Sequence, residues 1–184
     1  NSCAGLTFAA SSTASSFTHN ATTALTVNGN VTVNQPTASF TTAWNINQGA
    51  STVTGSVNLG GSNTTTTRVA KIVVTTGSLS IAGNLVHNSS ATTAQTAIGD
   101  VSTGGGTATL NLAGAMTLTN NTGTLTPGAL GSIVNYNGSS SSQTVRFGSA
   151  ITYNNLHLNN TNVNGAVLGA AISAGNVTGN VRIQ

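Results

Sequence analysis

The sequence predicts an all-β protein, a parallel β-helix (β-solenoid) of about six coils, and three observations lead to this fold. First, a short apolar pattern with a small residue at its centre occurs six times in the 184 residues. Second, the centres lie 26 to 35 residues apart, which is typical of stacked supersecondary units. Third, Thr, Val, Ile and Leu favour strands and Gly and Asn favour turns, whereas helix formers are scarce.

The repeated pattern indicates how each coil is built. Five copies read apolar-x-Gly-x-apolar, and strict alternation places their apolar residues on one face of a strand. The central glycine permits a bend or bulge where a larger side chain would crowd the interior. His87 occupies an apolar position of its copy, so we expect a hydrogen-bonded core histidine there. The centres are Gly29, Gly55, Gly83, Gly114 and Gly179, with a weaker copy around Ser149.

The elements follow one another in a regular order. Residues 1–20 are small and hydroxyl-rich and carry no copy, so we expect an N-terminal cap or docking arm there. Residues 21–184 form a single solenoid domain in this interpretation. A second apolar stretch follows each of the first five repeated patterns; these stretches lie near residues 44–46, 69–73, 98–101, 133–136 and 167–168. The alternative fold is an antiparallel β-sandwich, which does not explain one pattern returning at near-constant intervals.

Composition excludes several classes of function. Ser, Thr and Asn make up 78 residues, and only five side chains carry a formal charge. The one acid, Asp100, cannot form a paired-carboxylate site or a calcium cage. The three histidines lack metal-binding spacing. We therefore expect neither catalytic residues nor a cofactor or metal site, and we expect that the protein is not an enzyme. Four scattered cations argue against nucleic-acid binding, and the apolar runs are too short for a membrane span.

Lys71 and Asp100 are the only lysine and the only acid in the chain. Lys71 lies 12 residues before Gly83 and Asp100 lies 14 before Gly114, so a solenoid would place them on adjacent coils. One interpretation is an exposed ion pair worth about 0–1 kcal/mol. The other is an intramolecular amide crosslink, formed by Lys71 with Asp100 or with an Asn that Asp100 assists.

One segment resembles a known repeat. Gln143-Thr144-Val145 is followed by Tyr153-x-Asn155-Leu156-x-Leu158. This pair of motifs resembles a repeat of large secreted bacterial surface proteins. The wider set of Gly-centred coils is similar to filamentous-haemagglutinin-like adhesin stalks. The resemblance implies an extracellular or cell-surface role and supplies no catalytic residues.

The two ends of the predicted solenoid suggest its function. The sequence finishes inside a repeated pattern with no polar cap, and few charges oppose association. We expect a non-enzymatic extracellular structural subunit that assembles end to end with other copies into a surface filament or fibre. The candidate assembly residues are Leu6, Phe8, Val181 and Ile183. The alternative is an adhesin stalk segment that binds glycans or a surface. Ice binding is a weaker variant, because Thr-x-Thr pairs do not recur at one position of the repeat.

Overall fold

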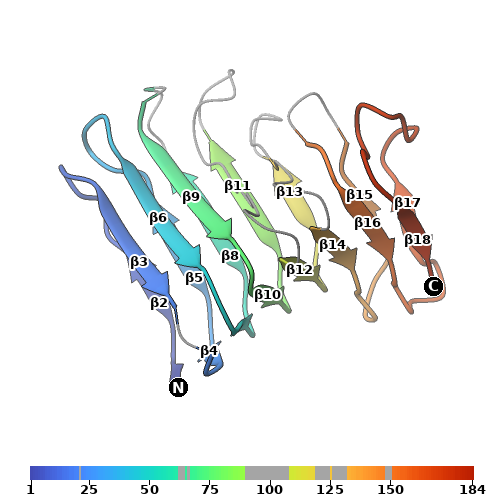
Figure 1. Ribbon diagram of the computed structural model, residues 1–184, viewed down its shortest axis with the longest axis horizontal. Coiled ribbons are helices and arrows are strands. Elements are labelled where there is room, and N and C mark those ends of the chain that lie inside the picture. The colour runs from blue at the N-terminus through green and yellow to red at the C-terminus, as the bar shows by residue number, and fades with distance from the viewer. Residues whose placement is uncertain are drawn as a thin grey trace.

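A computed structural model describes residues 1–20, 22–61, 65, 67–89, 108–118, 125, 132–147 and 151–184. Strands, and no helices, occur in these residues, and all their pairings are parallel. The chain winds as a β-solenoid, with its N-terminal strands at one end and its C-terminal strands at the other (Figure 1). The predicted fold is confirmed, and the antiparallel sandwich is excluded.

Three faces make up each complete coil, and we call them A, B and C in chain order. Face A is a sheet of eight strands: β1 (Ser2–Cys3), β4 (Leu25–Val27), β7 (Ala50–Val53), β10 (Ser78–Ile81), β12 (Thr109–Leu112), β14 (Ile133–Tyr136), β16 (Asn155–Leu158) and β18 (Val181–Ile183). Face C contains β3 (Ser15–His19), β6 (Thr41–Ile46) and β9 (Val69–Val74).

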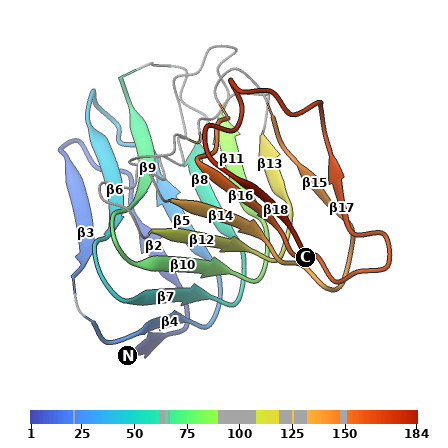
Figure 2. The same cartoon turned by 45° about the vertical axis from the view of Figure 1, so that its right-hand side comes forward.

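Face B lies next to face A and consists of two sheets. The first contains β2 (Leu6–Phe8), β5 (Val31–Asn34), β8 (Val57–Gly61), β11 (Leu85–Ser89) and β13 (Met116–Leu118). The second contains β15 (Gln143–Val145) and β17 (Ala166–Leu168), which continue the same row (Figures 1 and 2). The Arg146 Nε donates to the Met116 carbonyl at 3.2 Å and so links the second sheet to the first.

The core consists of columns of apolar side chains. Neighbouring strands pair in register, so residues at the same position of successive coils stack on one another. On face B, Val31, Val57, Leu85 and Met116 form one such column and are at most 2% exposed. The matching column on face A contains Cys3, Val27, Val53, Ile81, Leu112, Tyr136, Leu158 and Ile183.

The repeated pattern is a corner between two strands, and this corrects its description as one continuous strand. Face A ends before the glycine, and face B begins after it, as in β4, Gly29 and β5. The amide of Gly55 donates to the Gly29 carbonyl at 3.0 Å, and that of Gly83 donates to Gly55 at 2.9 Å. A Cβ atom on Gly83 would lie 2.7 Å from the Gly55 carbonyl oxygen. Glycine is needed because the corners stack in backbone contact.

Polar side chains complete the hydrogen bonding of the same corner. The Asn30 Oδ1 accepts from the amide of Ser56 at 2.8 Å, and the Ser56 Oγ accepts from the amide of Asn84 at 3.0 Å. The Asn84 Oδ1 in turn accepts from the amide of Ala115 at 2.8 Å. This ladder satisfies backbone donors that the turn removes from the sheets.

Two copies of the pattern differ from the other four. Gly179 lies at the corner where the chain enters face A, because β18 follows it and Val177 pairs with Tyr153 before it. Ser149 lies outside the described residues. The predicted division into residues 1–20 and 21–184 stays a prediction. Residues 1–20 include β1, β2 and β3, which pair with β4, β5 and β6 as a first coil.

We predict that Gly83→Ala lowers the free energy of unfolding by about 1–3 kcal/mol, because the new methyl group overlaps the corner below it. The matched control is Gly175→Ala, whose Cβ would meet only the Ser173 Oγ, at 3.8 Å. Urea denaturation followed by circular dichroism measures both variants. Equal stability of the two variants would show that corner stacking does not require glycine.

Candidate functional site

The two ends of the solenoid are the most distinctive surfaces of the described residues. At the N-terminal end, which we call the head, β1, β2 and β3 each have a partner on one side only. At the C-terminal end, which we call the tail, the same holds for β17 and β18 (Figure 1). An edge strand presents unpaired N–H and C=O groups, which are a template for pairing with another strand.

Exposed apolar side chains concentrate at these ends. Among the described residues, large apolar side chains that are exposed occur in the first two coils and in residues 163–183. Ile183 at the tail is 78% exposed, and Phe17 at the head is 41% exposed. The set comprises Phe17, Phe40, Val163, Val167, Leu168, Ile172, Val181 and Ile183.

The four predicted assembly residues lie at opposite ends of the molecule. Leu6 and Phe8 are partly buried on the edge strand β2 at the head, in register with Val31 and Val33. Val181 and Ile183 are exposed on the edge strand β18 at the tail. Each of the four is the outermost described residue of a column of stacked core residues. Their role in assembly stays a prediction.

Aromatic residues close the core at the head. The rings of Phe8 and Phe17 are 6.3 Å apart, and Phe8 lies 6.4 Å from the buried Trp44. Phe17 pairs in register with Trp44 and Trp44 with Ile72, so Phe17 occupies a core position. The repeated pattern did not identify Phe17, because no glycine lies close to β3 in the sequence. Its alternation with the polar Ser16 and Thr18 was the available signal.

An apolar cleft of about 350 Å³ lies at the tail. It lies where β18 extends face A beyond β17, the last described strand of face B. Apolar side chains of β16, β17 and β18 line it. The lining residues are Leu158, Asn160, Gly165, Ala166, Leu168, Ile183 and Gln184.

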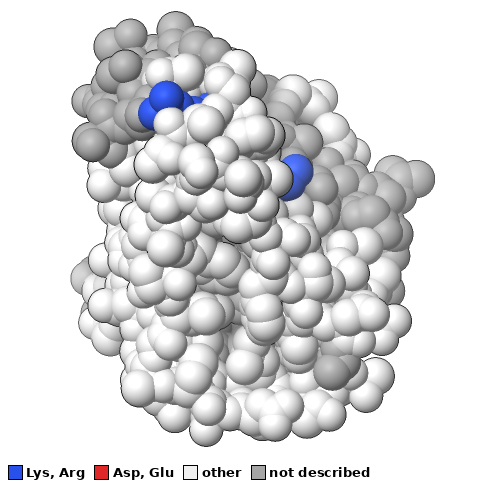
Figure 3. Space-filling model, turned by 90° about the vertical axis from the view of Figure 1, so that its left-hand side faces the viewer, with Lys and Arg blue, Asp and Glu red and all other residues white. Residues whose placement is uncertain are grey.

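Little charge occupies the head. In the view onto this end, a few basic groups and no acidic group are visible (Figure 3). Lys71 lies on the outer side of β9, between the buried residues Ala70 and Ile72. Asp100 lies outside the described residues, so the predicted ion pair or crosslink with Lys71 stays a prediction.

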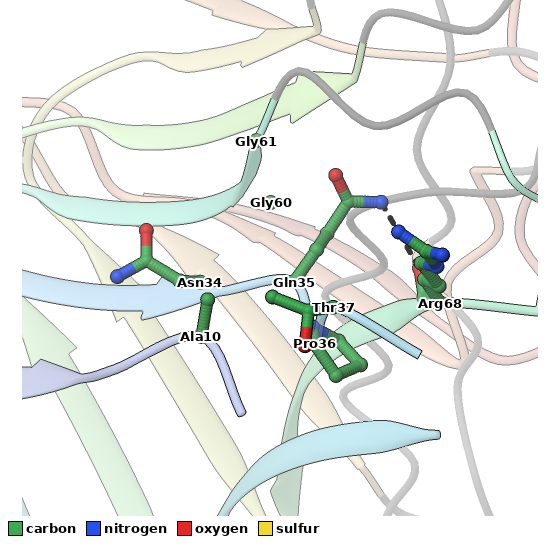
Figure 4. A pocket seen from close by; sticks show the side chains of 8 residues that line it. All are labelled: Ala10, Asn34, Gln35, Pro36, Thr37, Gly60, Gly61 and Arg68. Atoms are coloured by element: carbon green, nitrogen blue, oxygen red, sulfur yellow. Dashed lines mark hydrogen bonds between the residues drawn. The ribbon is translucent and has the colours of Figure 1, made fainter. Parts of the chain in front are cut away.

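A second cleft, of about 250 Å³, lies beside face B in the first three coils (Figure 4). Gln35 and Arg68 supply its most polar side chains, and the Gln35 Nε2 donates to the Arg68 carbonyl at 3.0 Å. Asn34, Pro36 and Thr37 provide the remaining larger side chains. The described lining residues therefore offer a guanidinium, amides and the Thr37 hydroxyl, which are hydrogen-bonding groups for a polar ligand.

The histidines of the first four coils are core residues. The His19 Nε2 donates to the Thr23 carbonyl at 2.9 Å, and its Nδ1 forms a hydrogen bond with the Ser51 hydroxyl, also at 2.9 Å. Ser51 is 1% exposed, which keeps this Ser–His pair away from any substrate. His87 is fully buried, between Leu59 and Leu118 on face B. The described residues contain no group of three or more metal-ligating side chains.

The outer side of face A carries a polar ladder along the whole solenoid. The Asn135 Nδ2 donates to the Asn111 Oδ1 at 3.0 Å, and the Asn111 Nδ2 donates to the Ser80 Oγ at 3.2 Å. Thr residues are adjacent only at the start of this ladder, so it is not a regular threonine array. In stacking order its members are Ser2, Thr26, Thr52, Ser80, Asn111, Asn135, His157 and Arg182.

Comparison of the chain with protein-family models, curated proteins and solved structures finds no match. Within the described residues, no helix has the length and apolar character needed to cross a membrane.

We predict that Arg182→Gln raises the pKa of His157. Burial, and secondarily the Arg182 guanidinium on the adjacent strand, hold that pKa below its ordinary value of about 6.5. The substitution removes only the second cause, so the pKa approaches the ordinary value without reaching it. An NMR titration of the imidazole measures the shift, with Arg68→Gln at a distant coil as the control.

The direction of the shift also fixes its effect on stability. Below pH 6.5 the unfolded chain protonates His157 while the folded chain resists protonation, so this contribution to stability is lost as the pH falls. An unchanged His157 pKa in Arg182→Gln would contradict the electrostatic part of this explanation.

Proposed function

We propose that this chain is a non-enzymatic structural subunit that assembles end to end with other copies into an extracellular filament or fibre. The observation that carries the proposal is the combination of open parallel strand edges and exposed core-column residues at both ends. Ile183, which is 78% exposed, stacks directly on Leu158, which is 7% exposed. Fully burying such a side chain contributes about 1.5–3 kcal/mol, so another layer on the tail is favourable.

The direction of the strands determines how two copies would associate. Every pairing in the described solenoid is parallel, so a second copy continues the sheets only if its head meets the tail of the first. Such a head-to-tail contact joins two different surfaces and leaves one of each free. It therefore propagates into an open polymer rather than a closed pair.

An extracellular location is part of the proposal. It is supported by a surface with few charges and by the resemblance of residues 132–158 to repeats of secreted bacterial surface proteins. A stalk segment that binds glycans is the second candidate. The polar ladder of face A favours it, because Ser, Thr and Asn side chains donate to and accept from sugar hydroxyl groups.

Electron microscopy across a concentration series tests the proposal. We expect filaments of the unmodified chain above a threshold concentration, and we expect Ile183→Asp to raise that threshold about ten- to hundredfold, since each 1.4 kcal/mol is a factor of ten. The matched control is Val163→Asp, because Val163 is 95% exposed but lies outside every strand. Circular dichroism verifies that both variants fold.

If the unmodified chain forms only single particles at every concentration, the filament proposal is overturned, and the glycan-binding stalk is the remaining candidate. Filaments that Ile183→Asp and Val163→Asp affect equally would show that β18 is not at the contact.

A further inference from the structure

We infer that the cleft beside face B binds one acidic sugar residue of the uronic acid class, with the Arg68 guanidinium on its carboxylate. The site goes beyond the proposed function, because it lies on the side of the solenoid and does not depend on assembly. Its lining residues come from three successive coils: Ala10 from the first, residues 34–37 from the second, and Gly60, Gly61 and Arg68 from the third (Figure 4).

The cleft exists because glycines stand where the next coil would otherwise place side chains. Asn34 pairs in register with Gly60, so the next place along the two strands sets Gln35 against Gly61. A Cβ atom on Gly61 would lie 3.4 Å from the Gln35 Oε1, so the Gln35 side chain reaches the space that this glycine leaves. Gly60 has a positive φ of 102°, a conformation that residues with side chains rarely adopt. Two glycines in succession therefore leave this part of face B open.

Hydrogen bonds fix the backbone around Arg68. The Arg68 carbonyl accepts from the Gln35 Nε2 at 3.0 Å, and the Arg68 amide donates to the Thr65 carbonyl at 3.2 Å. The next residue, Val69, begins β9, and its amide donates to the Phe40 carbonyl at 3.0 Å. These bonds hold the base of the Arg68 side chain in place before a ligand arrives, which lowers the entropy cost of binding.

The Arg68 guanidinium has no carboxylate partner in the described part of the chain. The one acid of the sequence, Asp100, lies outside the described residues. The Arg68 Nε is buried and has no hydrogen-bond partner among the described residues. Buried N–H groups are nearly always hydrogen-bonded, and a guanidinium pairs well with the two oxygens of a carboxylate. A half-buried guanidinium in a cleft therefore favours a ligand that carries a carboxylate.

The other polar groups of the cleft match the hydroxyl groups of a sugar. The Asn34 Nδ2 donates to the Phe8 carbonyl at 2.9 Å, which leaves the Asn34 Oδ1 as an acceptor. Thr37 is exposed, and a threonine hydroxyl both donates and accepts. The cleft volume of about 250 Å³ lies below the roughly 300–1,000 Å³ of pockets for drug-sized ligands. One sugar ring with a carboxylate suits this size and this set of groups.

An NMR titration of the unmodified chain with glucuronate tests the inference, at a protein concentration that gives single particles. We expect saturable shifts of the amide signals of Gln35, Gly60 and Gly61, and weaker binding at higher salt, because part of the attraction is electrostatic. Glucose lacks the carboxylate, and N-acetylglycinate lacks the sugar hydroxyl groups. We expect each of these two probes to bind about tenfold more weakly than glucuronate, or less tightly still.

Substitutions at Arg68 and Thr37 test the two parts of the site. Arg68→Gln keeps the backbone carbonyl that binds Gln35, and we expect it to weaken glucuronate binding about ten- to hundredfold. The matched control is Arg182→Gln, which removes the same charge from β18 on face A and leaves binding unchanged. Thr37→Val keeps the shape of the side chain and removes its hydroxyl, so we expect a loss of about two- to tenfold. Circular dichroism verifies that the three variants fold.

Several results would each overturn the inference. Equal losses in Arg68→Gln and Arg182→Gln would show a general attraction of the anion to positive charge. Glucose that binds as tightly as glucuronate would remove the role of the carboxylate. N-acetylglycinate that binds as tightly would replace the sugar by a peptide carboxylate. An unmodified chain without saturable shifts at any glucuronate concentration would show that the cleft binds no acidic sugar, and it would leave the proposed end-to-end assembly in place.

Discussion

The structure depends on the direct stacking of one coil on the next at its corners. Four successive coils turn from face A to face B through Gly29, Gly55, Gly83 or Gly114, and each of these glycines lies against the backbone of the corner below it. This contact keeps the strands in register on both faces, and the register in turn builds the columns of apolar residues. A side chain at the corner would separate two coils and disturb both faces together. The few charged residues are compatible with this arrangement, because the outer faces hydrogen-bond through Ser, Thr and Asn ladders.

A solenoid built in this way has no intrinsic end. Interior layers bury Val, Leu and Ile in every column, whereas the first and last layers leave the same positions partly or largely exposed. The proposed self-association would therefore use the same contacts as folding, with the chain of another copy in place of the next coil.

Much of this arrangement could be predicted from the sequence. Alternation around Gly29, Gly55, Gly83 and Gly114 predicted the β-solenoid and its inward residues. The sequence shows six copies of the pattern, whereas face A has eight strands. Some strands were missed because the corner between Cys3 and Leu6 is shorter, and because the corners after Tyr136 and Leu158 lack the same glycine spacing. The split into two strands, the position of Gly179 at another corner, and Phe17 in the head were not predicted. Those features depend on which strand pairs with which, and local alternation does not contain that information.

The axial rise per subunit in a filament tests the account most directly. Strands of adjacent coils are about 4.8 Å apart. If the sheets continue from one copy to the next, the rise is a whole number of these spacings, about 38 Å for the eight strands of face A. Helical reconstruction from electron micrographs measures this distance. A rise that is not a whole number of strand spacings would contradict the continuous solenoid.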